Sequence, residues 1–201
     1  MSEAPITATV DISDAVSPRL RAAVAKLSDR TGLHKAMAFR VEDRVIENLQ
    51  AKDQTPNKLG GSRTHFWLNA SRTTVVTADD AAGQISIPGN GGGVRLHYLG
   101  GTVVAGANGS GKRWLTIPAR TESHGKTVSK FFDGDFGKGK WLFNRNRKPY
   151  AIADRATGVV YFWLTKSATI KKDPSVLPST EIMRSAAASA AADYINAEVA
   201  A

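Results

Sequence analysis

The sequence predicts an α+β protein with N-terminal helices, a central and mostly antiparallel β-sheet with long loops, and a C-terminal helix. Three observations support this class. Apolar residues recur at helical spacing before residue 51, short β-branched and aromatic runs alternate with glycine-rich breaks from 73 to 170, and an alanine-rich stretch follows residue 179. A chain of 201 residues, 42% of them hydrophobic, can form one domain with a core plus an extension.

Residues 1–15, here called the N-terminal arm, are predicted to be extended because their threonines, valines and prolines alternate without helical spacing. Ser17 and Pro18 are typical of a helix start, with the serine as N-cap and the proline in the first turn. Gly32 is the expected stop of this helix. Its apolar face is expected to contain Leu20, Val24 and Leu27.

A second helix is expected from His34 to Ala51, followed by a loop from Thr55 to Ser62 that contains proline and glycine. Its predicted buried stripe consists of Val41, Val45 and Leu49, and its predicted outer side of Arg40, Asp43, Arg44 and Glu47.

The middle of the chain is predicted to form short strands. Runs at Thr73–Thr77 and Gln84–Ile87 indicate a hairpin, because two aspartates and a glycine lie between them. Val94–Leu99 fits one helical turn or a strand, and the helical turn is favoured. Further short strands are expected at Thr102–Ala105, Trp114–Pro118, Trp141–Phe143 and Tyr150–Asp154. A short helix is expected at Ser123–Phe132 and irregular structure at Asp133–Lys140.

Val159–Ile170 is the longest predicted strand, and Gly158 before it suits a hairpin turn. Asp173–Pro178 is expected to be a linker. Ser179 or Thr180 then caps a helix that we treat as a separate C-terminal unit, residues 178–201. One face of this helix contains Met183, Ala187, Ala190 and Tyr194, whereas the other is nearly all alanine and serine. Such a helix either docks closely against a neighbour or is a mobile tail.

Several classes of protein are excluded by composition. The chain has no cysteine, which excludes disulfides, thiolate zinc sites, iron–sulfur clusters and cysteine nucleophiles. It has no run of about 18 apolar residues, so no membrane-spanning helix is expected. Its start, MSEAPITATV, lacks the features of a secretion signal, and we expect a protein made and used without export.

The positive charge is concentrated in one segment. The net charge is +9, and Lys112–Lys148 contains ten basic and three acidic residues. This balance suits nucleic acid or an acidic partner surface, although a solvated loop would have it too. The candidate partner-facing cations in the glycine-rich region 106–148 are Lys112, Arg113, Lys138, Lys140, Arg145, Arg147 and Lys148.

Aromatic residues lie among these cations. Trp141 and Phe143 fall within Lys138–Lys148, and such interleaving can bind single-stranded nucleic acid by stacking on bases. The favoured interpretation is that the two rings belong to a strand core and the cations to its wet edge.

No motif predicts catalysis, a metal or a cofactor. Gly106–Lys112 matches the spacing of a phosphate-binding loop, but Arg113 replaces the required hydroxyl and the next residues are strand-like. A hairpin loop between Thr102 and Ile117 is therefore expected instead. The four histidines, His34, His65, His97 and His124, are not at metal-ligand spacing. There is also no G-x-S-x-G elbow, so we expect no enzymatic activity.

Three stretches, taken in their order along the chain, carry a resemblance to a known family. They are LGGSRTHFW at Leu59–Trp67, VRLHYLGGTV at Val94–Val103 followed by LTIPAR at Leu115–Arg120 and HGK at His124–Lys126, and VVYFWLTKSATI at Val159–Ile170 followed by DPSVLP. This order resembles the phage virion-morphogenesis family, the tail-completion and neck proteins of Mu-like and related tailed phages. The motif positions, which would be structural, are Gly60, Gly61, His65, Trp67, His97, Gly100, Gly101, Ile117 and Pro118.

The resemblance implies a tail-completion-like domain at residues 16–177 and a structural role without catalytic residues. Such proteins form sixfold or twelvefold rings at the head–tail junction or tail top, and they contact neck, connector or tail-tube proteins and DNA in the lumen. It also implies assembly in the bacterial cytoplasm, location in the virion and no membrane contact. The arm and the basic insert Phe131–Lys148 depart from the family pattern. The competing classes are a stand-alone nucleic-acid-binding protein and, from the imperfect phosphate loop, a hydrolase or nucleotide-binding enzyme.

Overall fold

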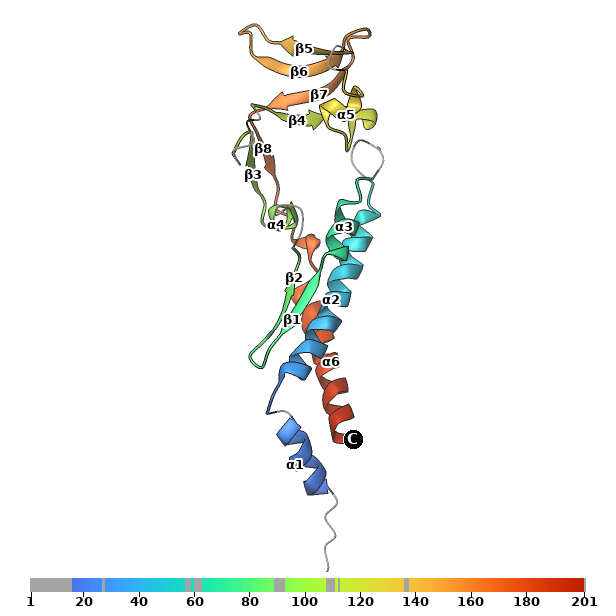
Figure 1. The fold of residues 1–201 in the computed structure, drawn as a ribbon, viewed down its shortest axis with the longest axis vertical. Helices are drawn as coiled ribbons and strands as arrows, with labels where there is room; N and C mark the ends of the chain where they lie inside the picture. Colours follow the sequence, from blue (N-terminus) through green and yellow to red (C-terminus); the bar gives the residue numbers. More distant parts are fainter. Residues whose placement is uncertain are drawn as a thin grey trace, which may run out of the picture.

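A computed structural model describes residues 16–26, 28–56, 59, 63–88, 93–107, 111, 113–135 and 138–200. The chain is elongated and has three parts in line (Figure 1). They are a helical stalk built on residues 31–53 and 180–200, a two-stranded ribbon of residues 101–104 and 167–170, and a β-sheet head within residues 113–165. The helices are α1 Val16–Lys26, α2 Thr31–Asp53, α3 Phe66–Arg72, α4 Gly93–Leu99, α5 Val128–Phe131 and α6 Thr180–Ala200. The strands are β1 Val75–Ala78, β2 Gly83–Ser86, β3 Gly101–Val104, β4 Leu115–Pro118, β5 Gly139–Phe143, β6 Pro149–Asp154, β7 Val160–Thr165 and β8 Ser167–Ile170. The predicted α+β class is confirmed.

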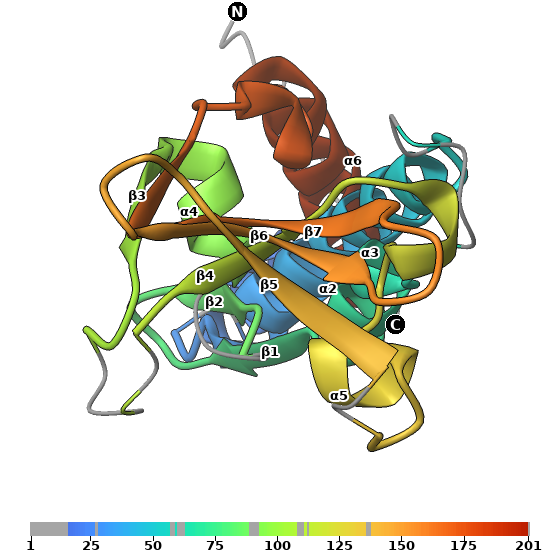
Figure 2. The same cartoon turned by 90° about the horizontal axis from the view of Figure 1, so that it is seen from above.

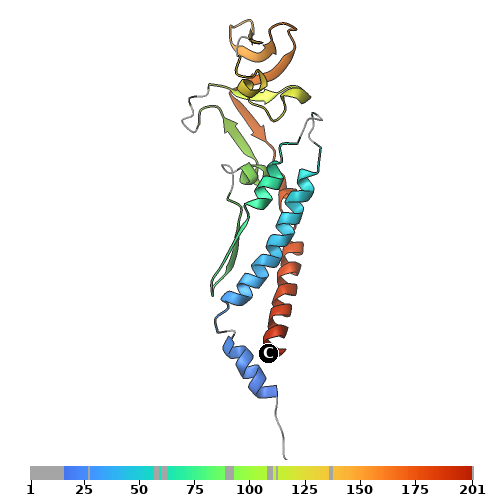
Figure 3. The ribbon, with the colours of Figure 1, turned by 45° about the vertical axis from the view of Figure 1, so that its right-hand side comes forward.

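The stalk is built on the pairing of α2 with α6, which lie side by side along its length (Figure 3). The predicted stripe of α2 is largely confirmed, because Val45 and Leu49 are buried and Val41 is half-buried. The predicted outer residues of α2 are all exposed. Of the two alternatives for the C-terminal helix, the docked one is correct, and the helix docks on its own chain. Ala186 and Ala190 of α6 are buried in this contact.

The expected stop at Gly32 is wrong. Helix α1 ends at Lys26, and Gly32 is the second residue of α2. The chain is held at the break by polar contacts, in which the Thr31 N–H donates to Asp29 and the Arg30 N–H to Asp80. Gly32 serves helix packing instead, since a Cβ there would lie 2.5 Å from the Tyr194 hydroxyl of α6. The glycine therefore lets α6 approach the start of α2.

The predicted hairpin in the 73–87 region is confirmed as β1 and β2, which pair antiparallel from Val75↔Ser86 to Ala78↔Gly83. It packs on α2 at Gly83, where a Cβ would lie 2.6 Å from the His34 carbonyl. The preferred helical turn at Val94–Leu99 is also confirmed, as α4.

Two predictions about the strands are wrong in the same way. β3 and β4 do not pair with each other as a hairpin; β3 pairs with β8, and β4 pairs with β7. The expected single strand Val159–Ile170 is divided at Lys166, so that β7 and β8 belong to different sheets. The cause is non-local. The two partner strands, β3 and β4, are separated in sequence by residues 105–114, so the continuous run 160–170 changes partner at Lys166.

The head consists of a four-stranded antiparallel sheet in the order β4-β7-β6-β5, with α5 beside it (Figure 2). As expected, β5 and β6 form around Trp141–Phe143 and Tyr150–Asp154, and Gly158 takes a turn conformation with φ of 72°. The buried core of the head is aromatic and aliphatic: Phe132, Ile152, Phe162 and Leu164. Phe131 of α5 packs edge-on against Phe162, with ring centroids 5.4 Å apart.

Two further expectations need correction. The expected helix Ser123–Phe132 is helical in α5 only, preceded by a single 3-10 turn at Thr121–Ser123. The expected linker Asp173–Pro178 contains another 3-10 turn, Pro174–Val176, in which Val176 is fully buried against Val45, Leu49 and Ala70. An apolar side chain in the middle of this polar, proline-containing segment anchors it to the stalk core.

The head meets the rest of the molecule at two places. One is the β3–β8 ribbon. The other is a contact between segment 121–125 and the end of the stalk, where Thr121 donates a hydrogen bond to the Leu59 carbonyl and Gly125 lies against Thr64. Among the described residues, no helix is long and apolar enough to cross a membrane.

Candidate interaction surfaces

The tip of the head is a basic hairpin turn between β5 and β6. Asn144 organises it, because its side-chain oxygen accepts hydrogen bonds from the N–H groups of Asn146 and Lys148, both at 3.0 Å. Arg147 adopts a positive φ of 56° to complete the turn. This ordered turn exposes Arg145, Arg147 and Lys148 to solvent.

Aromatic side chains lie exposed on the same hairpin and on the strand beside it. Trp141 is 49% exposed and Phe143 57% exposed, so the prediction that both belong to the strand core is wrong. Among the described residues, the helix beside the head sheet is α5, which has only four residues. Tyr150 and Trp163, also exposed, stack with ring centroids 6.3 Å apart. Cations and aromatic faces therefore share the surface of the head.

A groove of about 580 Å³ lies between α5 and the head sheet. Its lining is mostly apolar: Trp114, Val128, Phe132, Trp141, Ile152 and Leu164. Polar residues also line it, among them Arg113, Thr116 and Ser129. Lys166 lies close by, with its Nζ 4.1 Å from the centroid of the Trp114 ring and 3.0 Å from the Arg113 carbonyl oxygen, to which it donates. The groove thus combines an apolar floor with nearby positive charge.

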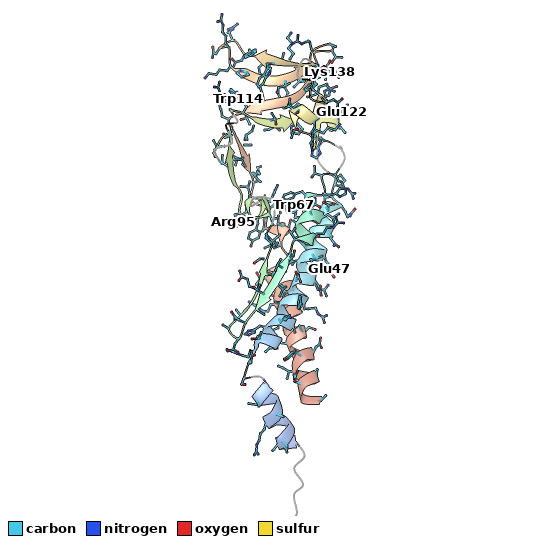
Figure 4. All side chains as sticks on the ribbon, viewed as in Figure 1. Glu47, Trp67, Arg95, Trp114, Glu122 and Lys138 are labelled. Carbon is cyan, nitrogen blue, oxygen red and sulfur yellow. The ribbon has the colours of Figure 1, made fainter. Side chains whose placement is uncertain are left out.

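A polar pocket of about 570 Å³ lies where the stalk, the ribbon and the head meet. Three histidines line it although they lie far apart in sequence: His65 before α3, His97 on α4 and His124 from the head. Trp67, which Figure 4 labels at this junction, packs edge-on against His97 with centroids 5.1 Å apart. The Nδ1 atom of His124 is buried and has no hydrogen-bond partner.

Asp53, at the end of α2, is the buried carboxylate of this pocket. Its Oδ2 lies 3.0 Å from His65 Nδ1, and its Oδ1 accepts from the Leu68 N–H at 3.2 Å. Burial alone would raise the pKa of Asp53, but the hydrogen bonds from His65 and Leu68 outweigh it and hold the pKa below its usual value. His65 adopts a positive φ of 52° at the start of α3, so the pair fixes how the chain enters this helix.

A second ion pair ties the 173–176 turn to the stalk. Lys52 Nζ lies 2.8 Å from Asp173 Oδ2 and 3.0 Å from Ser175 Oγ. The hydrogen bond from Lys52, followed by that from Ser175, lowers the pKa of Asp173 to about 2. The Asp173 N–H also donates to the His97 carbonyl at 2.9 Å, which connects this turn to α4.

These contacts describe a structural junction. Both carboxylates have a lowered pKa and are already paired, and among the described residues no hydroxyl hydrogen-bonds to a histidine ring. The described residues also include no group of three His, Asp or Glu side chains placed to hold a metal ion. The hydrogen bonds and ion pairs around this pocket fix α3, α4 and the 173–176 turn against the end of α2.

The residues predicted by family resemblance fall into two places. His65, Trp67 and His97 line the junction pocket, and Gly100 and Gly101 begin the ribbon beside it. Gly100 has a φ of 74°, and a Cβ there would lie 2.8 Å from the Lys172 nitrogen. Ile117 and Pro118 lie apart from these, on β4 of the head. Gly60 and Gly61 are outside the described residues.

The six predicted basic residues that the structure describes are all on the head. Arg113 precedes β4, Lys138 and Lys140 lie at β5, and the other three form the hairpin turn. All six are exposed, and Figure 4 shows Lys138 and Trp114 on opposite sides of the head in this view. Lys112 is outside the described residues.

Sequence reasoning missed the groove and most of the junction pocket. Lys52 and Asp53 end α2, whereas His124 and Asp173 come from two distant parts of the chain, so no local spacing could have joined these residues. The continuous apolar runs in β5, β6 and β7, which supply Trp141, Ile152 and Leu164 to the lining, were the available evidence for the groove.

Comparison of the chain with family models, curated proteins and solved structures gives no match.

Proposed function

We propose that this chain is a structural subunit of a tailed-phage virion, located at the neck or tail top, which assembles into a ring through protein–protein packing and has no enzymatic activity. Two independent lines support the proposal. One is the ordered resemblance in sequence to tail-completion and head–tail-joining proteins. The other is the incomplete burial of apolar side chains in the isolated chain.

The exposed apolar side chains are the observation that supports assembly most directly. Only thirteen apolar residues among those described are buried. Large apolar side chains stay exposed in every part: Phe39, Ile182 and Ile195 on the stalk, Leu99 and Val104 near the ribbon, and Ile117, Trp141, Phe143, Tyr150 and Trp163 on the head. Exposed apolar side chains that gather on one surface, as Tyr150 and Trp163 do on the head, are typical of surfaces that partners cover.

The distribution also favours a ring over a closed pair. A twofold dimer uses one patch that faces itself, whereas a ring subunit needs two different patches on different sides. Here the exposed apolar residues occupy several separate elements along the long axis (Figure 1).

Light scattering coupled to size-exclusion chromatography, with negative-stain microscopy, tests the proposal. We expect a closed ring of about six or twelve subunits. Deletion of the gene from its phage should give filled heads and tails that fail to join, or tails of abnormal finish. A monomer at all concentrations, together with normal infectious particles from the deletion, would reject the proposal.

A second candidate function is nucleic-acid binding by the head. It is favoured by one observation, the basic turn at Arg145–Lys148 beside exposed aromatic rings. Binding of this kind would be independent of duplex sequence, with a log–log salt slope of about −0.9 for each phosphate contacted. Replacing the basic residues by glutamine should flatten that slope without unfolding the head. The variant combines Lys138→Gln, Lys140→Gln, Arg145→Gln, Arg147→Gln and Lys148→Gln.

The same variant separates the two candidates. If the basic turn contacts protein, the variant should fail to dock with its partner ring while any DNA binding stays unchanged. We favour protein, because a conduit that gripped DNA strongly would slow its exit. Normal particle yield from the variant would remove both roles from these cations.

A further inference from the structure

We infer that the groove in the head of one copy is the docking site for the N-terminal arm of another copy, with residues 6–12 lying extended in the groove. The inference rests on the proposed assembly of identical subunits, and it identifies the contact between them. Four observations support it: the lining of the groove, the pattern of the arm, their charges and the reach of the arm.

The groove presents an apolar surface that none of the described residues covers. Phe132, Ile152 and Leu164 form its floor and are part of the buried core, while Trp114 and Trp141 are partly open to solvent. Two open tryptophans beside a core are typical of contact hot spots. Polar groups of Thr116 and Ser129 in the lining are exposed and can receive backbone groups of an extended peptide.

The arm has the matching pattern. Ile6, Ala8, Val10 and Ile12 alternate with Thr7, Thr9 and Asp11. In an extended chain, successive side chains point to opposite sides, so this segment has one apolar and one polar side. Its apolar side is the part that an apolar groove would bind.

The charges are complementary. The arm contains Glu3, Asp11 and Asp14 and no lysine or arginine, whereas Lys112–Lys148 has a net charge of +7. Arg113 lines the groove, and Lys166 lies over its Trp114 ring. Opposite net charges accelerate the encounter and fix the register of such a contact.

The reach of the arm makes the partner a second copy. The arm joins α1, which lies at the end of the molecule opposite the head (Figure 3). From Ile6 to Val16 an extended chain covers at most about 35 Å, at about 3.5 Å per residue. Helix α2 alone, which lies between α1 and the head, spans about 34 Å, and α1 adds about 16 Å. The arm therefore cannot reach the head of its own chain, nor that of a copy packed alongside at the same height, and the groove that it reaches belongs to a copy displaced along the long axis.

Disulfide capture between single-cysteine variants tests the contact directly, because the natural chain has no cysteine to interfere. Full-length Val10→Cys, in the arm, is mixed with full-length Ser129→Cys, at the groove. The matched control mixes Val10→Cys with Arg147→Cys, which is on the same head and exposed but outside the groove. The mixed dimers are quantified by gel and identified by peptide mass spectrometry.

We expect the groove pair to give at least about tenfold more mixed disulfide than the control pair, because a bound arm raises the local thiol concentration. A synthetic peptide of residues 1–15 in excess should reduce this yield, and the same peptide with Val10→Asp should not. Equal yields for the two pairs would overturn the inference. So would dominant Ser129→Cys self-dimers, which would mean that grooves face each other.

The result is distinguishable from failure of the proposed function. Rings without the groove cross-link would reject the arm contact but leave ring assembly in place. A cross-link in open chains or dimers, without rings, would retain the arm contact and reject the ring.

Discussion

In the stalk, the closest contacts are made by glycine and alanine, whereas in the head they are made by aromatic rings. Gly32 and Gly83 bring α6 and the β1–β2 hairpin up to α2, and Ala186 and Ala190 fill the helix interface. The head instead depends on Phe131, Phe132 and Phe162 around a small sheet. The stalk is therefore stabilised by close backbone approach over a long line, and the head by a few large side chains at one point.

The largest effect should come from removing a central ring of the head. Phe162 is fully buried, so Phe162→Ala should cost about 3–5 kcal/mol through lost burial and a cavity. Because the stalk has a separate core, helical circular dichroism should persist while the fluorescence of the head tryptophans changes. Leu49→Ala, in the stalk core, should instead lower the helical circular dichroism while the fluorescence of the head tryptophans persists. Simultaneous loss of both signals in each variant would contradict two separate cores.

A smaller effect is expected from crowding the stalk. Gly83→Ala should destabilise the chain by about 1–3 kcal/mol, because the new Cβ would meet a backbone carbonyl that cannot move aside. Chemical denaturation monitored by circular dichroism measures the loss. The exposed neighbour supplies the control, since Gln84→Ala should change stability by less than about 0.5 kcal/mol. An unchanged midpoint for Gly83→Ala would mean that the hairpin does not pack tightly on α2.

The junction between the two regions should respond to pH. The pKa of Asp173 is lowered to about 2 by Lys52 and Ser175, so its contribution to folding is present above the unfolded value of about 3.9 and is lost as pH falls through about 2. Asp173→Asn should cost about 1 kcal/mol at pH 7, a modest amount because the pair is partly exposed.

The variant should also reduce the dependence of stability on pH between 4 and 2, approximately the window set by the two pKa values. Denaturation midpoints across this range provide the measurement. Glu47→Gln, which removes an exposed pair with Arg44, is the matched control and should change little. If both variants show the same profile, the junction pair does not stabilise the fold.

The smallest effect on folding, with the largest effect on assembly, is expected at an exposed ring of the head. Phe143→Ser should change monomer stability by less than about 0.5 kcal/mol, because the ring is mostly in solvent. Light scattering should nevertheless show weaker assembly. Asn146→Ser, a polar change in the same hairpin, is the control. Unimpaired assembly of Phe143→Ser would remove this side of the head from the subunit contacts.

The sequence predicted what depends on local spacing. Val45 and Leu49 are buried because they recur at helical spacing, and the β1–β2 hairpin follows from two aspartates and a glycine between β-branched runs. It did not predict the division at Lys166, since that depends on the interrupted partner strand 61 residues earlier, at Ala105. His65, His97 and His124 likewise meet only because three elements converge.

The exposure of Trp141 and Phe143 was missed for a related reason. Alternation in a strand shows that two faces differ, but it does not show whether a second layer covers either face. In the head, α5 has four residues and covers only part of one face. Apolar side chains that look like core in the sequence are therefore left exposed.

The two attachments of the head limit how it can move relative to the stalk. A ribbon of four residue pairs lies on one side, and the contact of segment 121–125 with Leu59 and Thr64 lies on the other. Two anchor points on different sides resist rotation of the head about the long axis better than a single anchor would. If the proposed ring forms, the angle that these two anchors set for each head would determine the aperture of the ring at the head end.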